Sequence, residues 1–157
     1  MRIAIYTLGC KVNQYETQAM EQELLRRGHT LVPFETAADG YIVNTCSVTA
    51  VSDKKSRQMI RRCRKLNPAA VVAACGCYVQ THAAEAASLD IDLIAGTGDR
   101  MAFLDLFEQA ARERQPLTLL DDALRRREFE IRPAGGMAER TRAMLKVEDG
   151  CVNFCTY

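Results

Sequence analysis

Short apolar runs alternate with helical patterns along most of this chain, and this alternation constrains the fold more than any other feature. The runs are rich in β-branched and small apolar residues and cover residues 2–9, 30–34, 41–44, 71–75 and 92–95. Helical patterns separate them, at residues 13–27, 51–66, 81–88 and 99–112. Strands that alternate with helices form βαβ units. We therefore expect an α/β fold: a doubly wound, mostly parallel, flavodoxin-like sheet with helices on both faces.

Several residues mark the ends of these helical patterns. Asn13 is a candidate N-cap, because Glu16 follows it with the spacing of a capping box. Gly28 suits the position just after the first helix, and Pro68 ends the second. Asp99 opens the last helix.

The composition changes after residue 113. Residues 114–140 contain two prolines, a glycine pair and three consecutive arginines, a mixture typical of a connector. Residues 142–147 then read as a new strand, followed by a loop that contains Cys151 and Cys155. We expect an N-terminal domain at 1–113, a connector at 114–140 and the start of a second, truncated domain at 141–157.

Composition excludes several classes of protein. The net charge of +1 gives no overall field that would attract nucleic acid, so any such binding needs a local patch. No apolar run approaches the roughly 18 residues of a membrane span, and the first residues lack the features of a signal peptide. We expect a cytoplasmic protein with no membrane partner. Seven cysteines, without any Cys-x-x-Cys pair, exclude a zinc ribbon and a thioredoxin motif.

Three of these cysteines, Cys10, Cys46 and Cys77, each lie at the end of an apolar run and before a helical pattern. The carboxyl ends of parallel strands meet at one edge of a sheet, where ligands bind. A single such cysteine is more often a small buried apolar residue. Three at equivalent positions favour shared ligation of a metal, and thiolates select iron–sulfur clusters, zinc or Cu(I). Three thiolates on a four-iron cluster leave one iron open. Cys63 and Cys75 lie within apolar patterns and are expected in the core.

Three further features bear on ligands and partners. Cys151 and Cys155 form a Cys-x3-Cys pair directly after a predicted strand, and one more cysteine after Tyr157 would complete a Cys-x3-Cys-x2-Cys motif. The helical segment 54–65 carries seven lysines and arginines. It is either a solvated face or a surface that contacts RNA phosphates. Asn13 and Asn44, beside two of the candidate ligands, either orient the loops or cap them.

Four motifs resemble a known family. They are Thr-Leu-Gly-Cys-Lys-Val-Asn-Gln-Tyr-Glu at 7–16, Asn-Thr-Cys-Ser-Val-Thr at 44–49, Lys-Lys-Ser-Arg-Gln at 54–58 and Gly-Cys-Tyr-Val-Gln at 76–80. Together they resemble the radical-SAM methylthiotransferases. The Leu-Gly-Cys-Lys-Val-Asn form is most similar to the branch that modifies threonylcarbamoyladenosine in tRNA. Residues 142–157 resemble the start of the radical-SAM core.

The resemblance implies two 4Fe–4S clusters and S-adenosylmethionine as cofactors. Cys10, Cys46 and Cys77 would ligate the auxiliary, sulfur-donating cluster, and Cys151 and Cys155 the radical-SAM cluster. The implied reaction adds a methylthio group to C2 of N6-threonylcarbamoyladenosine at position 37, in the anticodon loop of ANN-decoding tRNA. The alternatives are the isopentenyladenosine tRNA branch, the ribosomal-protein branch, and a non-catalytic module that binds flavin or metal. We expect no methylthio transfer from this chain alone.

Overall fold

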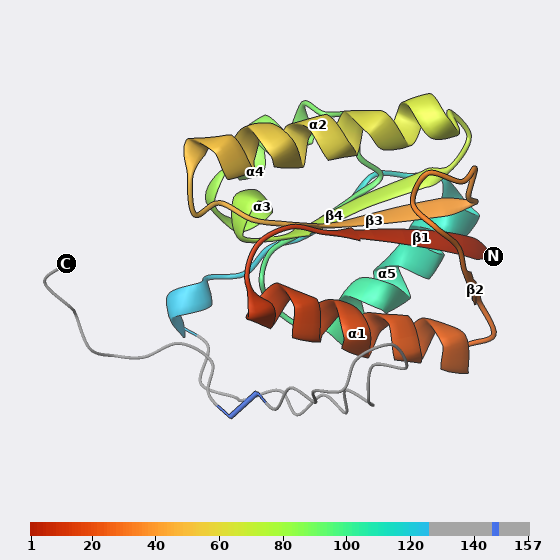
Figure 1. The fold of residues 1–157 in the computed structure, drawn as a ribbon, viewed down its shortest axis with the longest axis horizontal. Coiled ribbons are helices and arrows are strands. Elements are labelled where there is room, and N and C mark those ends of the chain that lie inside the picture. Colours follow the sequence, from red (N-terminus) through yellow and green to blue (C-terminus); the bar gives the residue numbers. More distant parts are fainter. Residues whose placement is uncertain (126–145, 148–157) are drawn as a thin grey trace, which may run out of the picture.

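A six-stranded parallel sheet forms the centre of the molecule, with neighbouring strands in the order β2-β1-β3-β4-β5-β6 (Figure 1). The computed structural model describes residues 1–125 and 146–147. Cys151, Cys155 and most of the predicted strand 142–147 lie outside the described residues. The strands are β1 (Arg2–Thr7), β2 (Thr30–Leu31), β3 (Gly40–Thr45), β4 (Val71–Gly76), β5 (Leu93–Ala95) and β6 (Leu117–Leu119).

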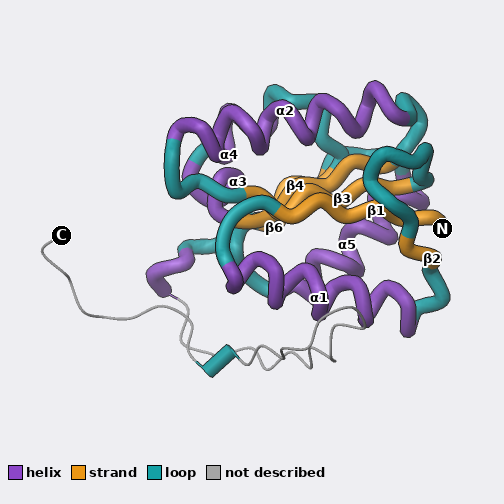
Figure 2. The backbone as a smooth tube through the Cα atoms, in the orientation of Figure 1, coloured by secondary structure: helices purple, strands orange, loops and turns teal. Residues whose placement is uncertain are grey.

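Helices cover both faces of this sheet (Figure 2). One face carries α1 (Lys11–Arg26) and α5 (Arg100–Glu113), and the other carries α2 (Ala50–Leu66), α3 (Cys77–Thr81) and α4 (Ala83–Ala87). A short 3-10 helix, η1 (Ala123–Arg125), follows β6. The connection changes direction between β1 and β3, which is the topological switch point of a flavodoxin-like sheet. The predicted doubly wound α/β fold is confirmed.

Two apolar clusters fill the spaces between the sheet and its helices. The two central strands, β3 and β4, are fully buried, so their side chains alternate between the two faces. Tyr41 and Val43 join Ile60 in the cluster beneath α2, whereas Ile42 joins Leu24 and Phe107 on the side of α1 and α5. Among the described residues, no helix combines the length and apolar character needed to cross a membrane.

The structure corrects the predicted cap of the first helix. The helix begins at Lys11 rather than Asn13. Cys10 occupies the N-cap position without a capping hydrogen bond, and its Sγ donates to Asn13 Oδ1 at 3.9 Å. Asn13 is buried, and its amide donates hydrogen bonds to Leu8 O and Thr45 O. The capping-box spacing of Asn13 and Glu16 was therefore misleading, because both side chains are used in tertiary contacts.

Two elements differ from the sequence prediction in extent. The helix expected at 81–88 is two short helices: α3 begins at Cys77, and α4 follows after a break at His82. The sheet also continues beyond residue 113, because β6 pairs with β5 inside the range predicted as a connector. Leu117 N donates to Asp92 O at 2.8 Å, which ties the start of β6 to the sheet.

Candidate metal centre

The sheet register brings Cys10, Cys46 and Cys77 to the same edge. β1, β3 and β4 are neighbours, and the register pairs Thr7 with Asn44 and Thr45 with Gly76 at their carboxyl ends. Cys46 directly follows β3 and Cys77 directly follows β4, while Cys10 lies at the N-cap of α1 just beyond β1. The three thiols therefore stand beside the switch point, where ligands bind in doubly wound sheets.

The three cysteines differ in solvent exposure. Cys46 is 4% exposed, Cys77 is half-buried, and Cys10 is exposed. Burial raises the pKa of the Cys77 thiol, and the nearby Cys46 and Cys10 raise it further. A cation close to Cys77 would offset this effect. Cys10 leaves the centre open toward solvent.

Two buried asparagines fasten the loops that carry Cys10 and Cys46. The Asn13 amide donates to Leu8 O at 2.7 Å and to Thr45 O at 2.9 Å, so it joins the two loops. The Asn44 amide donates to Asn13 O at 3.0 Å and to Thr17 Oγ1 at 3.2 Å. These contacts support the interpretation that both asparagines orient the loops.

Two glycines allow the loops to approach closely. Gly9 has a φ of +100°, and a Cβ there would lie 2.8 Å from Cys46 Sγ. Gly76 has φ 99° and ψ −166°, a conformation essentially restricted to glycine. A Cβ at Gly76 would lie 2.5 Å from Thr45 O. The sequence shows both glycines before a cysteine, but their steric role becomes clear only from the fold.

The loop after Cys46 is held by the first turns of α2. Ser56 Oγ donates to Cys46 O at 3.1 Å, and Cys46 N donates to Ser56 Oγ at 3.4 Å. Thr49 caps the helix by accepting a hydrogen bond from Ser52 N at 3.2 Å. Cys46 is therefore fixed by its own backbone, which leaves its thiol available as a ligand.

A buried ion pair supports the centre from the side of α1 and α5. Arg100 Nη2 lies 2.7 Å from Glu16 Oε2, and Arg100 Nη1 donates to Gly96 O at 2.8 Å. Both side chains are almost fully buried, and Lys146 Nζ lies 3.8 Å from Glu16 Oε1. Glu16 raises and Arg100 lowers the pKa of Cys77, so their charges reach the thiols. The sequence alone did not predict this pair.

All three candidate ligands are thiols. Thiolates are the soft ligands that iron–sulfur clusters, zinc and Cu(I) select. Within 1–125 and 146–147, no three side chains of His, Cys, Asp or Glu are arranged to hold a metal ion. The ligand role of Cys10, Cys46 and Cys77 therefore stays a prediction.

The other cysteines of the described chain are core residues, as predicted. Cys63 is a fully buried residue of α2, and its Sγ donates to Met59 O at 3.2 Å. Cys75 is fully buried in the cluster on the side of α1 and α5. Cys151 and Cys155 lie outside the described residues, so their ligand role stays a prediction.

The fold and the centre define a doubly wound α/β protein with three thiols at its switch point. The chain belongs to the family described as "Uncharacterized protein family UPF0004", whose model matches residues 2–96. That range includes all three thiols.

Named relatives and a solved structure resemble this chain. It is 44% identical to the threonylcarbamoyladenosine tRNA methylthiotransferase MtaB of Bacillus subtilis (strain 168), over 99% of this chain and 35% of the relative. It is 35% identical to the protein of that name in Aquifex aeolicus (strain VF5), over 100% of this chain and 38% of the relative. The chain thus spans little more than a third of either. The isolated REC domain of RcsB from Salmonella enterica serovar Typhimurium shares the fold alone, with a TM-score of 0.51, 16% identity, and coverage of 75% of this chain and 92% of that chain.

Proposed function

We propose that this chain forms the N-terminal part of a radical-SAM tRNA methylthiotransferase, and that Cys10, Cys46 and Cys77 hold its auxiliary 4Fe–4S cluster. The observation that carries the proposal is the register of β1, β3 and β4, which places three thiols at one sheet edge. The cluster would supply sulfur chemistry at an iron that has no protein ligand. The names of the relatives support the reaction class.

Several residues of the chain position the three thiols for the proposed cluster. Cys10 stands at the N-terminus of α1, whose partial positive charge would stabilise an anionic cluster. Asn13 and Asn44 fix the spacing of two ligand loops through buried hydrogen bonds. Gly9 and Gly76 permit these loops to approach, because a side chain at either position would collide with the neighbouring loop. These contacts hold the loops that carry the three thiols without any bound metal.

The substrate and the second cluster complete the proposal. We infer that the substrate is N6-threonylcarbamoyladenosine at position 37 of tRNA, because two relatives carry that nucleoside in their names. S-adenosylmethionine would serve as cofactor at a second 4Fe–4S cluster, ligated in part by Cys151 and Cys155. A cytoplasmic location follows from this substrate.

Anaerobic reconstitution with ferrous iron and sulfide tests the auxiliary centre. The chain is prepared with Cys151→Ala and Cys155→Ala, so that only the sheet edge can bind a cluster. We expect visible iron–sulfur absorption and about four irons per chain, both lost on adding Cys46→Ala. The matched control is Cys63→Ala, which removes a buried thiol elsewhere and should retain the cluster. Tight zinc binding without iron uptake would contradict the proposal and indicate a metal-binding module instead.

A further inference from the structure

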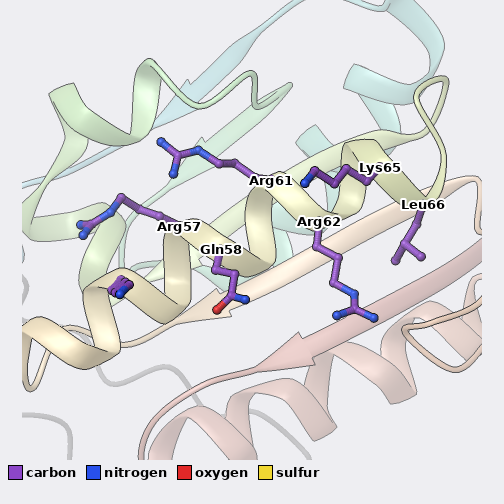
Figure 3. Close-up of a pocket in the computed structure, with 7 residues that line it drawn as sticks. Arg57, Gln58, Arg61, Arg62, Lys65 and Leu66 are labelled. Carbon is purple, nitrogen blue, oxygen red and sulfur yellow. The ribbon is translucent and has the colours of Figure 1, made fainter.

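The outward face of α2 carries a row of cations. Seven of the chain's 21 lysines and arginines lie on this helix, which contains one acidic residue, Asp53. Lys54, Arg61 and Lys65 follow one another at helical spacing, with Gln58 between them, so they share a single face. All four side chains are exposed. Arg57 and Arg62 flank this basic stripe on its two sides (Figure 3).

The flanking arginines are neutralised, but the cations of the stripe are not. Arg57 lies 3.2 Å from Glu85, and Arg62 pairs with Glu35. Lys54, Arg61 and Lys65 form no ion pair with any acidic side chain in the described part of the chain. Like charges three or four residues apart on a helix repel each other. An external anion would relieve this repulsion.

The shape and chemistry of the surface favour an extended polyanion. The stripe residues and their flanking arginines line a shallow hollow, in which Leu66 is the one apolar lining residue. A protein partner would need an apolar or aromatic centre to its interface, and among the described residues that line this surface Leu66 alone is apolar. Lys54 and Lys65 are separated by about 16 Å along the helix axis. That length suits several successive phosphates of one strand.

The stripe begins next to the candidate metal centre. α2 starts just after Cys46, and Ser56 in its second turn is hydrogen-bonded to the backbone of Cys46. The helix then runs from the carboxyl edge of the sheet across its face (Figure 1). A strand of phosphates bound along α2 therefore has one end at the cysteines.

We propose that Lys54, Arg61 and Lys65 bind RNA phosphates and direct the substrate nucleoside toward the cysteine edge. This assignment rests on the proposed function, because it takes RNA as the substrate. Contacts of this kind position a nucleic acid without reading its sequence. The surface therefore contributes affinity and orientation, and the choice of nucleoside belongs to the centre itself.

Salt-dependent binding of a fluorescent tRNA transcript tests the proposal. The chain is compared with Arg61→Gln, Lys65→Gln and the double variant. We expect weaker binding, with the slope of log K against log salt concentration reduced by roughly 0.7–0.9 for each cation removed. The matched control is Arg112→Gln, an exposed arginine on α5 at the opposite face of the sheet. This control removes the same charge and should leave both affinity and slope unchanged.

Three outcomes would overturn the assignment. They are no binding of tRNA at low salt, equal losses in the stripe variants and in Arg112→Gln, or displacement of tRNA by polyglutamate as effectively as by unlabelled RNA. The last result would assign the stripe to an acidic protein segment.

Iron uptake, measured on the same variants, separates this assignment from the proposed function. Uptake should be normal in Arg61→Gln and Lys65→Gln, since neither residue touches a thiol. The unaltered chain could fail to take up iron and still bind tRNA in a salt-dependent way. That result would contradict the cluster proposal and would leave the assignment of the RNA-binding surface intact.

Discussion

Cys63 is a thiol that the fold keeps protonated. Burial raises its pKa from 9.0 to about 12, and its Sγ donates a hydrogen bond to Met59 O. Because the folded pKa exceeds the unfolded one, the stability linked to this thiol is complete below about pH 9 and is lost as pH rises toward 12. We expect the free energy of unfolding to fall there by up to about 1.4 kcal/mol per pH unit from this group.

Urea unfolding between pH 8 and about 10.5 measures the Cys63 effect. Cys63→Ala should be less stable at pH 8, because it leaves a small cavity, but its stability should decline less steeply with pH. The other titrating groups are common to both proteins and cancel in the difference. Identical slopes would show that the thiol is solvated in the folded state.

At the scale of elements, the turn from β4 into α3 is tightly constrained by the conformation of one residue. Gly76 adopts a conformation essentially restricted to glycine, and a side chain there would meet Thr45 O at 2.5 Å. We expect Gly76→Ala to lower the free energy of unfolding by about 3 kcal/mol or more and to abolish iron uptake, because Cys77 would be displaced. Urea unfolding and anaerobic reconstitution measure the two effects.

Gly28 provides the matched control for this turn. It also has a positive φ, of +82°, but a Cβ there has open space around it. Gly28→Ala should therefore show only the cost of the left-handed conformation, about 1–2 kcal/mol, with iron uptake preserved. If both variants lose the same free energy of unfolding, the close contact between the new Cβ and Thr45 O does not destabilise the protein.

At the scale of the whole molecule, the three proposed ligands come from three separate βα units. A cluster bound by all of them would bind the folded chain much better than the unfolded one, and so stabilise it. We expect reconstitution of the chain carrying Cys151→Ala and Cys155→Ala to raise the free energy of unfolding by about 3–4 kcal/mol. Anaerobic urea titration measures this, with Cys46→Ala as the control that should show no rise. If iron binds without raising the free energy of unfolding, the metal is held by ligands that are also available in the unfolded chain.

The sequence predicted those features that depend on local pattern. Cys10, Cys46 and Cys77 could be placed at one edge because each ends a recognisable strand, and parallel strands end together. The sixth strand was missed because three residues after Pro116 carry too little pattern to distinguish a strand from a connector. Pairing with β5 makes it a strand, and that information is not local.

The supporting contacts of the centre could not be predicted for a related reason. Arg100 and Glu16 are 84 residues apart, so nothing near either one indicates the other. For Asn13 a local pattern was present, since its spacing from Glu16 predicted an N-cap, but its side chain makes tertiary hydrogen bonds instead. Its amide joins two loops that are adjacent only in the folded sheet.

Both outer strands of the sheet are very short. β2 has two residues and β6 has three, so each offers few unpaired backbone groups at the margin. Long exposed margins invite other chains to add strands and so promote aggregation. In the described part of the chain, neither outer strand gives another chain a long margin to extend. The edge that carries Cys10, Cys46 and Cys77 is made of strand ends, so it can stay open to solvent without acting as a template for polymerisation.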